Sequence, residues 1–241
     1  MSERLHATAK LSPLVASVMR TLDGAPTTVG DLAPGDVVDA ALLARRRKLV
    51  RFGVPAKDHD AILADTLAPR DALCHARRFF AAREKRVLVL GGLKGTGKTT
   101  AAGWLVAKGP PLPPLLPPPG LVRAARLDDW PAECHPRFIS ASDLQSIGLY
   151  DRDAQAPLRA ASVLAIDDLG IEFSDRAEVF KAVLEAILDA RCRALLWTVL
   201  TTNVTKPELF ANRYGARTHE RVLEFGVYVV AVDRVREPRV P

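Results

Sequence analysis

The chain has 241 residues, of which 48% are hydrophobic and 26% are charged, so it can hold one α/β domain and a smaller appendage. It has no run of about 18 apolar residues and no apolar signal-peptide core at its start, so we expect a cytoplasmic protein that does not span a membrane. The net charge of +6 favours a partner that carries phosphates, and the scattered Cys74, Cys134 and Cys192 form no C-x-x-C pair, which argues against a zinc site or a disulfide framework.

The first third of the chain is predicted to be helical. Apolar residues at helical spacing predict helices over residues 12–22, 36–52 and 69–84, with Gly-, Pro- and Asp-rich connections between them. This part has too little apolar bulk to build a large core of its own. We therefore expect residues 1–60 to form a small helical partner-binding region and residues 61–241 to form the main domain.

A cluster of positive charge lies on the second of these predicted helices. It consists of Arg45, Arg46, Arg47, Lys48 and Arg51. Such a cluster is commonly the solvated face of a helix, and for the cluster alone we favour that interpretation. Because the chain as a whole is basic, the same residues are also candidate contacts for DNA or for a protein partner.

Residues 87–100, VLVLGGLKGTGKTT, carry the strongest functional signal in the chain. Four apolar residues predict a buried strand, the Ala-rich residues 100–108 predict a helix, and residues 92–99 between them match the phosphate-loop pattern G-x-x-x-x-G-K-[ST] without a mismatch. Glycines in such a loop let backbone N–H groups approach a polyphosphate, and the helix presents its N-terminus to the same anion. The stretch therefore predicts a nucleotide site.

The positions of this loop have separate expected roles. Lys98 supplies a positive charge to the β- and γ-phosphates, and the Thr99 hydroxyl is an expected ligand of Mg²⁺. ATP and Mg²⁺ are therefore the expected cofactors. The nucleotide-binding residues that we predict are Gly92, Leu93, Lys94, Gly95, Thr96, Gly97, Lys98, Thr99 and Thr100.

Residues 109–120, GPPLPPLLPPPG, follow the predicted helix. Proline at this density excludes a helix or a central strand, so we expect an extended excursion from the domain. Such a segment could recruit a proline-reading domain, although an inert lengthened loop is the simpler interpretation. Further along, residues 137–140 predict a short strand.

An apolar run that ends in two acids, SVLAIDD, occupies residues 162–168. The pattern is weak by itself, but about 70 residues after a complete phosphate loop it predicts the second half of a Mg²⁺-dependent ATPase site. Asp167 is the expected ligand of Mg²⁺, directly or through water. Asp168 is expected to polarise the attacking water.

The continuous apolar run of residues 194–203 predicts a buried parallel strand that ends at Asn203. If this strand lay between the other two, the Asn203 amide would reach the γ-phosphate or the attacking water, although polar residues at strand ends are also common in turns. Further on, Arg217 and Arg221 are four residues apart and share one helix face. Residues 227–232 predict a last strand.

In this order the motifs resemble those of one family. GLKGTGKT, VLAIDDLG, LTTN, RYGARTHERV and a final VDRVR are similar to the motifs of the DnaC/IstB branch of the AAA+ ATPases, over roughly residues 40–236. That branch comprises bacterial and phage replicative helicase loaders and the ATPase subunits of some transposons. The resemblance implies a three-layer α/β P-loop NTPase with a mostly parallel five-stranded sheet, in which the strand ending at Asn203 lies between the phosphate-loop strand and the Asp167 strand.

The resemblance also implies roles for individual residues. Asn203 corresponds to a polar sensor, Arg221 to an arginine finger that acts in the neighbouring subunit's site, and Arg217 to a second arginine of the same motif. Without the resemblance, both arginines would be interpreted as a solvated helix face. The implied activity is slow ATP hydrolysis by a self-associating protein, because Asp168 stands where many AAA+ proteins carry a longer Glu.

Three functions remain open from the sequence. The first is an ATP-dependent helicase loader in DNA replication initiation, which binds a replicative helicase and single-stranded DNA. The second is a transposition helper ATPase that binds duplex DNA and a transposase, since both classes share the ATPase core. The third is a nucleotide-regulated adaptor with little hydrolysis. A GTPase is disfavoured, because NVTK at residues 203–206 does not match the guanine-reading pattern N-K-x-D.

Overall fold

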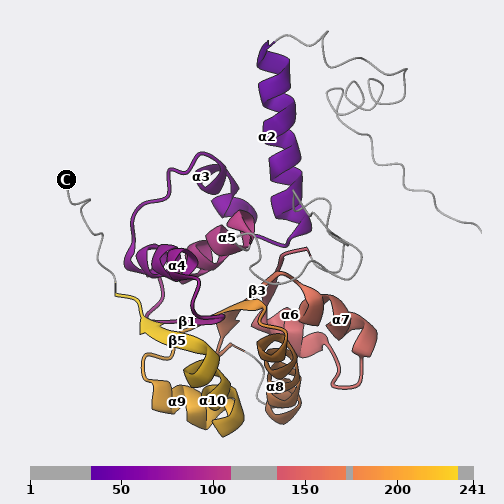
Figure 1. The fold of residues 1–241 in the computed structure, drawn as a ribbon, viewed down its shortest axis with the longest axis vertical. Helices are drawn as coiled ribbons and strands as arrows, with labels where there is room; N and C mark the ends of the chain where they lie inside the picture. Colours follow the sequence, from indigo (N-terminus) through magenta and orange to yellow (C-terminus); the bar gives the residue numbers. More distant parts are fainter. Residues whose placement is uncertain (1–33, 110–134, 172–175, 233–241) are drawn as a thin grey trace, which may run out of the picture. The chain divides into compact units, whose positions relative to one another are not determined.

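The computed structural model describes residues 34–109, 135–171 and 176–232. The chain divides into two units, Met1–Leu43 and Ala44–Pro241, and of the first only the start of helix α2 (Pro34–Arg51) is described. The helix predicted over residues 12–22 and residues 110–120 of the Pro-rich stretch lie outside the described residues. The sheet and the helices that cover it all belong to the second unit (Figure 1).

Strands and helices alternate along the second unit. Its strands are β1 (Val87–Gly91), β2 (Arg137–Ser140), β3 (Val163–Leu169), β4 (Trp197–Thr202) and β5 (Gly226–Val230). The helices around them are the 3₁₀ helix η2 (Ala56–Asp58) and the α-helices α3 (His59–Leu63), α4 (Asp71–Ala82), α5 (Lys98–Lys108), α6 (Ala141–Ser146), α7 (Arg152–Ala160), α8 (Ala177–Arg193), α9 (Pro207–Tyr214) and α10 (Ala216–Phe225). Every strand that the sequence predicts is present. In the described part of the chain, none of the helices is both long and apolar enough to cross a membrane.

All five strands run parallel, in the order β2-β3-β4-β1-β5. Strand β4 pairs with β1 on one side and with β3 on the other, and Leu200 lies opposite both Val89 and Ile166. This order confirms the predicted α/β fold and the predicted place of the strand that precedes Asn203. The sheet is wholly parallel rather than mostly so. Parallel strands end at the same edge, which brings the polar residues after β1, β3 and β4 together.

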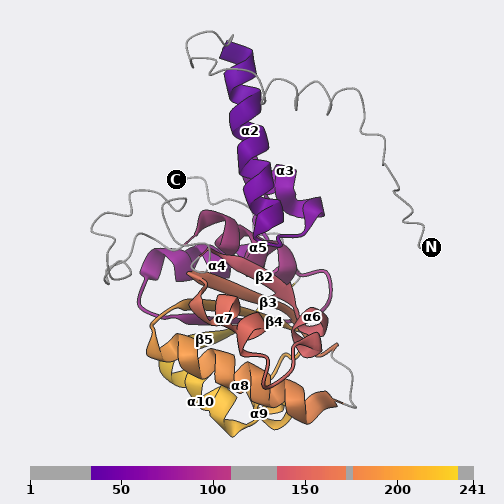
Figure 2. The ribbon, with the colours of Figure 1, turned by 90° about the vertical axis from the view of Figure 1, so that its right-hand side faces the viewer.

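Helices cover both faces of the sheet and make three layers (Figure 2). In β3, Val163 and Ala165 pack in the cluster that contains α4 and α5, whereas Leu164 and Ile166 pack in the cluster that contains α8, α9 and α10. Each central strand is therefore buried on both faces. Strands of this kind have continuous apolar sequences, which is the reason that the sequence alone reveals them.

The end of α2 and the turn after it belong to the main domain. Leu49, Phe52 and Val54 are buried in the same cluster as α4 and α5. The backbone N–H of Phe138 in β2 donates a hydrogen bond of 2.6 Å to the Phe52 carbonyl. The second unit begins at Ala44, so residues 53–55, where the sequence predicts the end of a helix, lie inside it. The expected boundary between residues 60 and 61 stays a prediction.

A fully buried arginine ties two strands together at the edge of the sheet where they begin. Arg191 of α8 donates from Nη1 to the carbonyls of Leu158 (2.8 Å) and Ala161 (2.6 Å), from Nε to Thr198 Oγ1 (2.8 Å), and from Nη2 to the Trp197 carbonyl. Burial lowers the pKa of Arg191 to about 9. Because the guanidinium has five N–H donors in one plane, a single side chain can donate hydrogen bonds both to carbonyls that precede β3 and to the first carbonyl of β4.

Candidate functional site

The phosphate loop connects β1 to α5, and its glycines are required by its shape. Gly92 has a φ of 137°, and a Cβ added there would lie 2.4 Å from the Ala231 carbonyl oxygen. Gly97, the residue before α5, has a φ of 84°, and a Cβ there would lie 3.0 Å from Cδ of Arg70. L-amino acids with side chains rarely adopt these angles. The loop thus has the bare backbone that phosphate binding requires.

Lys98, the first residue of α5, is folded onto this loop. Its ammonium donates to the carbonyls of Gly92 (2.7 Å) and Leu93 (2.8 Å) and to Asn203 Oδ1 (3.3 Å). Burial lowers the pKa of Lys98, although the charges of Asp168 and Asp167 act in the opposite direction. The lysine is therefore a buried cation at the point where β1, β3 and β4 end.

Asp167 is a buried carboxylate near the end of β3. It accepts a hydrogen bond of 2.6 Å from Thr201 Oγ1 of β4, and the Thr99 side chain of α5 lies near enough to affect its pKa. Burial raises the pKa of Asp167 above its ordinary value, and the hydrogen bond from Thr201 opposes that shift. Asp167 and Thr99, the two residues that the sequence predicts as Mg²⁺ ligands, consequently lie near each other.

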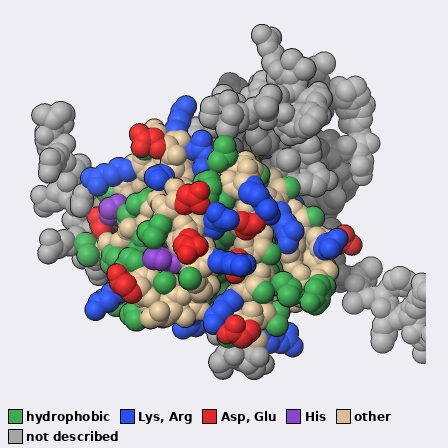
Figure 3. Space-filling view, turned by 60° about the horizontal axis from the view of Figure 1, so that its bottom comes forward, with side chains coloured by type: hydrophobic (Ala, Val, Ile, Leu, Met, Phe, Trp, Pro, Cys, Tyr) green, Lys and Arg blue, Asp and Glu red, His purple; other side chains and the backbone are tan. Residues whose placement is uncertain are grey.

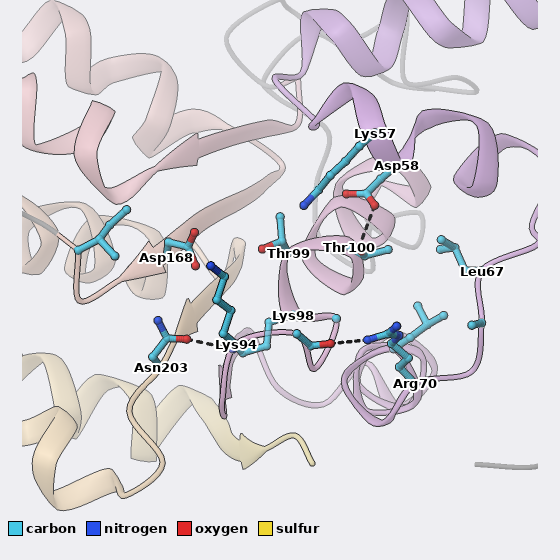
Figure 4. Close-up of a pocket in the computed structure, with 15 residues that line it drawn as sticks. Lys57, Asp58, Leu67, Arg70, Lys94, Lys98, Thr99, Thr100, Asp168 and Asn203 are labelled. Carbon is cyan, nitrogen blue, oxygen red and sulfur yellow. Dashed lines mark hydrogen bonds between the residues drawn. The ribbon is translucent and has the colours of Figure 1, made fainter. Parts of the chain in front are cut away.

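The backbone changes course between the two acids. Asp168 has a φ of 57°, in the left-handed region, and the register of β3 against β4 shifts between Ile166 and Leu169. The Thr201 hydroxyl that donates to Asp167 also accepts a hydrogen bond of 2.9 Å from the backbone N–H of Asp168. As a result, one threonine positions both acids, with Asp167 held against it and Asp168 directed into the cavity (Figure 4).

Lys98, Asp168 and Asn203 line one cavity of about 700 Å³ (Figure 4), whereas Asp167 is buried beside it. That volume lies within the range of about 300–1,000 Å³ that is typical of small-molecule sites. Of the residues predicted from the sequence, those that line it are Lys94, Gly95, Gly97, Lys98, Thr99, Thr100, Asp168 and Asn203. Gly92 and Leu93 bind the Lys98 ammonium instead, and the Thr96 hydroxyl donates to the Leu93 carbonyl at 3.0 Å.

The segment ahead of β1 supplies a wall of the cavity that sequence analysis missed. Lys57, Asp58 and Arg70 line it. Arg70 donates from Nη1 to the Gly95 carbonyl, and Asp58 Oδ1 accepts a hydrogen bond of 2.9 Å from Thr100 Oγ1. The sequence assigns these residues no part in the nucleotide site, because their position there depends on the folding of residues 44–70 against α5.

The pair of Thr99 and Asp167 suits a hard divalent cation. Hydroxyl and carboxylate oxygens are the donors that Mg²⁺ prefers, and one or two protein ligands are sufficient when phosphate and water oxygens complete its shell. The two side chains lie near each other, and Thr99 lines the cavity. Elsewhere in the described ranges, His, Cys, Asp and Glu form no group of three or more that could hold a metal.

Arg217 and Arg221 lie together on α10, on one helix face as predicted, but they do not line the cavity. Arg221 forms ion pairs with Asp189 of α8 and Glu224 of α10, both at 3.0 Å, and the hydrogen bond to Glu224 is the main cause of its raised pKa. Arg217 lies 3.2 Å from Glu185. Acidic and basic side chains are intermixed on the face that Figure 3 brings forward. The role of the two arginines in a neighbouring subunit's site stays a prediction.

The basic cluster on α2 is largely exposed. Arg45, Arg47 and Arg51 are exposed, and Arg46 forms an ion pair of 3.1 Å with Asp60. Lys48 is half-buried. The surface is compatible with both predicted interpretations, a solvated helix face and a contact for DNA or protein.

Comparisons with known proteins give matches among solved structures. Neither a family model nor a curated protein matches the chain. The chain is similar to the DnaC helicase loader at 21% identity, over 70% of this chain and 95% of that one, with a TM-score of 0.49. It is similar to DnaI at 21% identity, over 67% and 83% of the two chains, with a TM-score of 0.48. It is similar to AMPPCP-bound DnaA from Aquifex aeolicus at 15% identity, over 68% of this chain and 46% of that one, with a TM-score of 0.46. A likeness at these identities concerns the fold.

Proposed function

We propose that the chain binds ATP in this cavity and hydrolyses it with the help of Mg²⁺. The observation that carries the proposal is the meeting of Lys98, Asp168 and Asn203 around one cavity, next to a glycine-lined phosphate loop. Lys98 begins the helix that follows β1, and the other two residues lie at the ends of β3 and β4. A polyphosphate bound there meets backbone N–H groups, the N-terminus of α5 and a buried cation. Phosphoryl transfer depends mainly on such positioning and charge.

The chemistry is divided among the residues of the site. Lys98 and the loop backbone hold the β- and γ-phosphates, and Thr99 with Asp167 would hold Mg²⁺, which neutralises charge on those phosphates. Asp168 orients the attacking water, and Asn203 contacts that water or the γ-phosphate. These assignments agree with the proximity of Thr99 and Asp167 and with the exposure of Asp168 to the cavity.

We further propose that the protein is a helicase loader that acts in replication initiation. The resemblance of the motifs supports this assignment, together with the exposed basic residues of α2 as candidate contacts for single-stranded DNA. The described residues include few exposed aromatic rings, so phosphate contacts should dominate and DNA affinity should fall steeply with salt. Residues 1–60 would contact the helicase, and self-association would place Arg221 at the neighbouring subunit's nucleotide.

ATP turnover by the purified protein tests these proposals. It should be measured alone, with single-stranded DNA and with duplex DNA, at low salt. Stimulation by single strands is the result expected of a loader. Stimulation by duplex DNA alone would identify a transposition helper instead. Tight ATP binding without turnover under any condition would contradict the ATPase and leave the adaptor function.

A further inference from the structure

A lysine outside the phosphate loop and the acidic pair lines the cavity together with Asp168. Lys57 is the middle residue of η2 and lines the cavity with Thr99 and Asp168. Its side chain extends from η2 toward these two residues (Figure 4). The ammonium therefore lies near the expected position of the γ-phosphate and its metal.

The backbone of η2 is fixed to the helix that carries Thr99. Asp58 is buried, and its Oδ1 accepts a hydrogen bond of 2.9 Å from Thr100 Oγ1 in the first turn of α5. His59, also buried, makes a hydrogen bond of 2.8 Å from Nε2 to the Val54 carbonyl. The backbone of Lys57, next to these two anchored residues, is thus held in place. Only the flexible side chain of Lys57 has to adjust to a ligand.

The Lys57 charge differs from Lys98 and Arg70, two other cations of the cavity, in its surroundings. Lys98 is bound by two loop carbonyls, and Arg70 is bound by the Gly95 carbonyl. Among the described residues, no salt bridge to a carboxylate engages Lys57, and its side chain is exposed to the cavity. A charge that is fixed near the phosphates and has no carboxylate partner is suited to an anionic ligand.

We propose that Lys57 is a further catalytic residue, which contacts the γ-phosphate from within the same chain. The inference rests on the proposed ATPase function. In hydrolysis the water oxygen bonds to the γ-phosphorus, the bond to the β–γ bridging oxygen breaks, and its electron pair leaves with ADP; the water releases one proton, for which Asp168 is the acceptor. Lys57 exchanges no proton in this step. Its ammonium offsets charge on the γ-phosphate oxygens, as an arginine finger supplied in cis does.

The test compares Lys57→Ala and Lys57→Arg with Lys85→Ala, which removes an equal charge outside the cavity. Binding of ATP, binding of ADP and turnover at saturating ATP are measured for each full-length variant. Lys57→Ala should weaken ATP binding while ADP binding changes little, and should reduce turnover at least about tenfold. Lys57→Arg should restore most of both, and Lys85→Ala should match the wild type. Thermal unfolding of Lys57→Ala should be unchanged, because the side chain is exposed.

Other outcomes separate the inference from the function on which it rests. Equal losses for ATP and ADP would place Lys57 away from the γ-phosphate, and wild-type values in Lys57→Ala would make it a solvated lysine. Either result overturns the inference and leaves the ATPase intact. A wild-type protein that binds neither nucleotide would overturn the proposed function and the inference together.

Discussion

The domain contains two buried cations at opposite edges of one sheet, and they are built differently. Lys98 lies where β1, β3 and β4 end, is 5% exposed and has two acids beside it. Arg191 lies where β3 and β4 begin, is 0% exposed and donates to backbone carbonyls and a hydroxyl. Burial lowers the pKa of both groups. Both are cations that the fold keeps out of bulk water.

The difference lies in what surrounds each charge. The hydrogen bonds of Arg191 end on strand and helix termini that must meet for the sheet to form, so its contribution is to stability. Lys98 opens on a cavity of about 700 Å³, and its partners belong to a loop whose shape suits an anion. We infer that the sheet is stabilised at one edge and performs chemistry at the other. Substitutions at the two positions should consequently produce different kinds of defect.

Arg191→Met should cause the largest effect, on folding alone. The substitution leaves the carbonyls of Leu158, Ala161 and Trp197 without their donor inside the domain. We expect the free energy of unfolding to fall by about 3–5 kcal/mol, as measured by chemical denaturation. Arg191→Lys keeps the charge but has fewer N–H donors, so its free energy of unfolding should lie between those of the wild type and Arg191→Met. Unchanged stability in Arg191→Met would contradict a structural role.

Lys98→Ala should have the opposite profile. ATP affinity should fall about 100-fold, which corresponds to about 2.7 kcal/mol, because the β- and γ-phosphates lose their buried cation. The free energy of unfolding should change little, since the substitution relieves the burial that lowers the pKa of Lys98. Calorimetric titration with ATP checks the first expectation and denaturation the second. Retained ATP affinity would exclude this loop as the phosphate site.

Arg221→Ala extends the comparison to an exposed arginine. Its ion pairs with Asp189 and Glu224 lie at the surface, where solvent screens them, so stability should change little. If Arg221 acts in a neighbouring subunit, turnover should fall at least about tenfold while ATP binding is kept. Mixing Arg221→Ala with Lys98→Ala subunits should then restore turnover. Mixed subunits that stay inactive would place the arginine finger elsewhere.

Asp167→Asn should have the smallest effect on stability, and that effect should depend on pH. The pKa of Asp167 is raised in the folded protein, so the folded state holds this proton more tightly than the unfolded state does. Ionisation of Asp167 therefore costs stability as the pH rises through the raised pKa. The asparagine variant should lose this dependence and be more stable than the wild type at neutral pH. Urea unfolding from acidic to neutral pH measures this dependence. If the free energy of unfolding followed the same pH dependence in both proteins, the raised pKa of Asp167 would be disproved.

The parts of the fold that the sequence predicts are those with local patterns. The phosphate loop needs glycines with positive φ between a strand and a helix. The whole loop motif lies in eight consecutive positions, residues 92–99, so the sequence alone reveals it. The apolar runs before Asp167 and Asn203 reveal strands that are buried on both faces. The strand order itself came from resemblance, and it placed β4 between β1 and β3 as the structure does.

The parts that sequence missed depend on contacts between distant residues. Asp58 and Thr100 are 42 positions apart, and Arg191 and Leu158 are 33 apart, so no spacing reveals either pair. The burial of Phe52 and Val54 likewise depends on contacts with distant residues of the domain. The spacing of Arg217 and Arg221 predicts their shared face, but it cannot show that acids of α8 pair with them.

Equilibrium ATP binding and single-turnover hydrolysis, compared in the wild type and Asp168→Asn, test the proposed nucleotide site most directly. Asp168 lines the cavity near Lys98, but its proposed role is to orient the attacking water. Its substitution should therefore affect ATP hydrolysis and not ATP binding. We expect ATP affinity to stay within about threefold of the wild type, while hydrolysis falls about 100-fold. A wild-type protein that binds no ATP in the presence of Mg²⁺, or a variant that hydrolyses ATP at the wild-type rate, would contradict the proposed site.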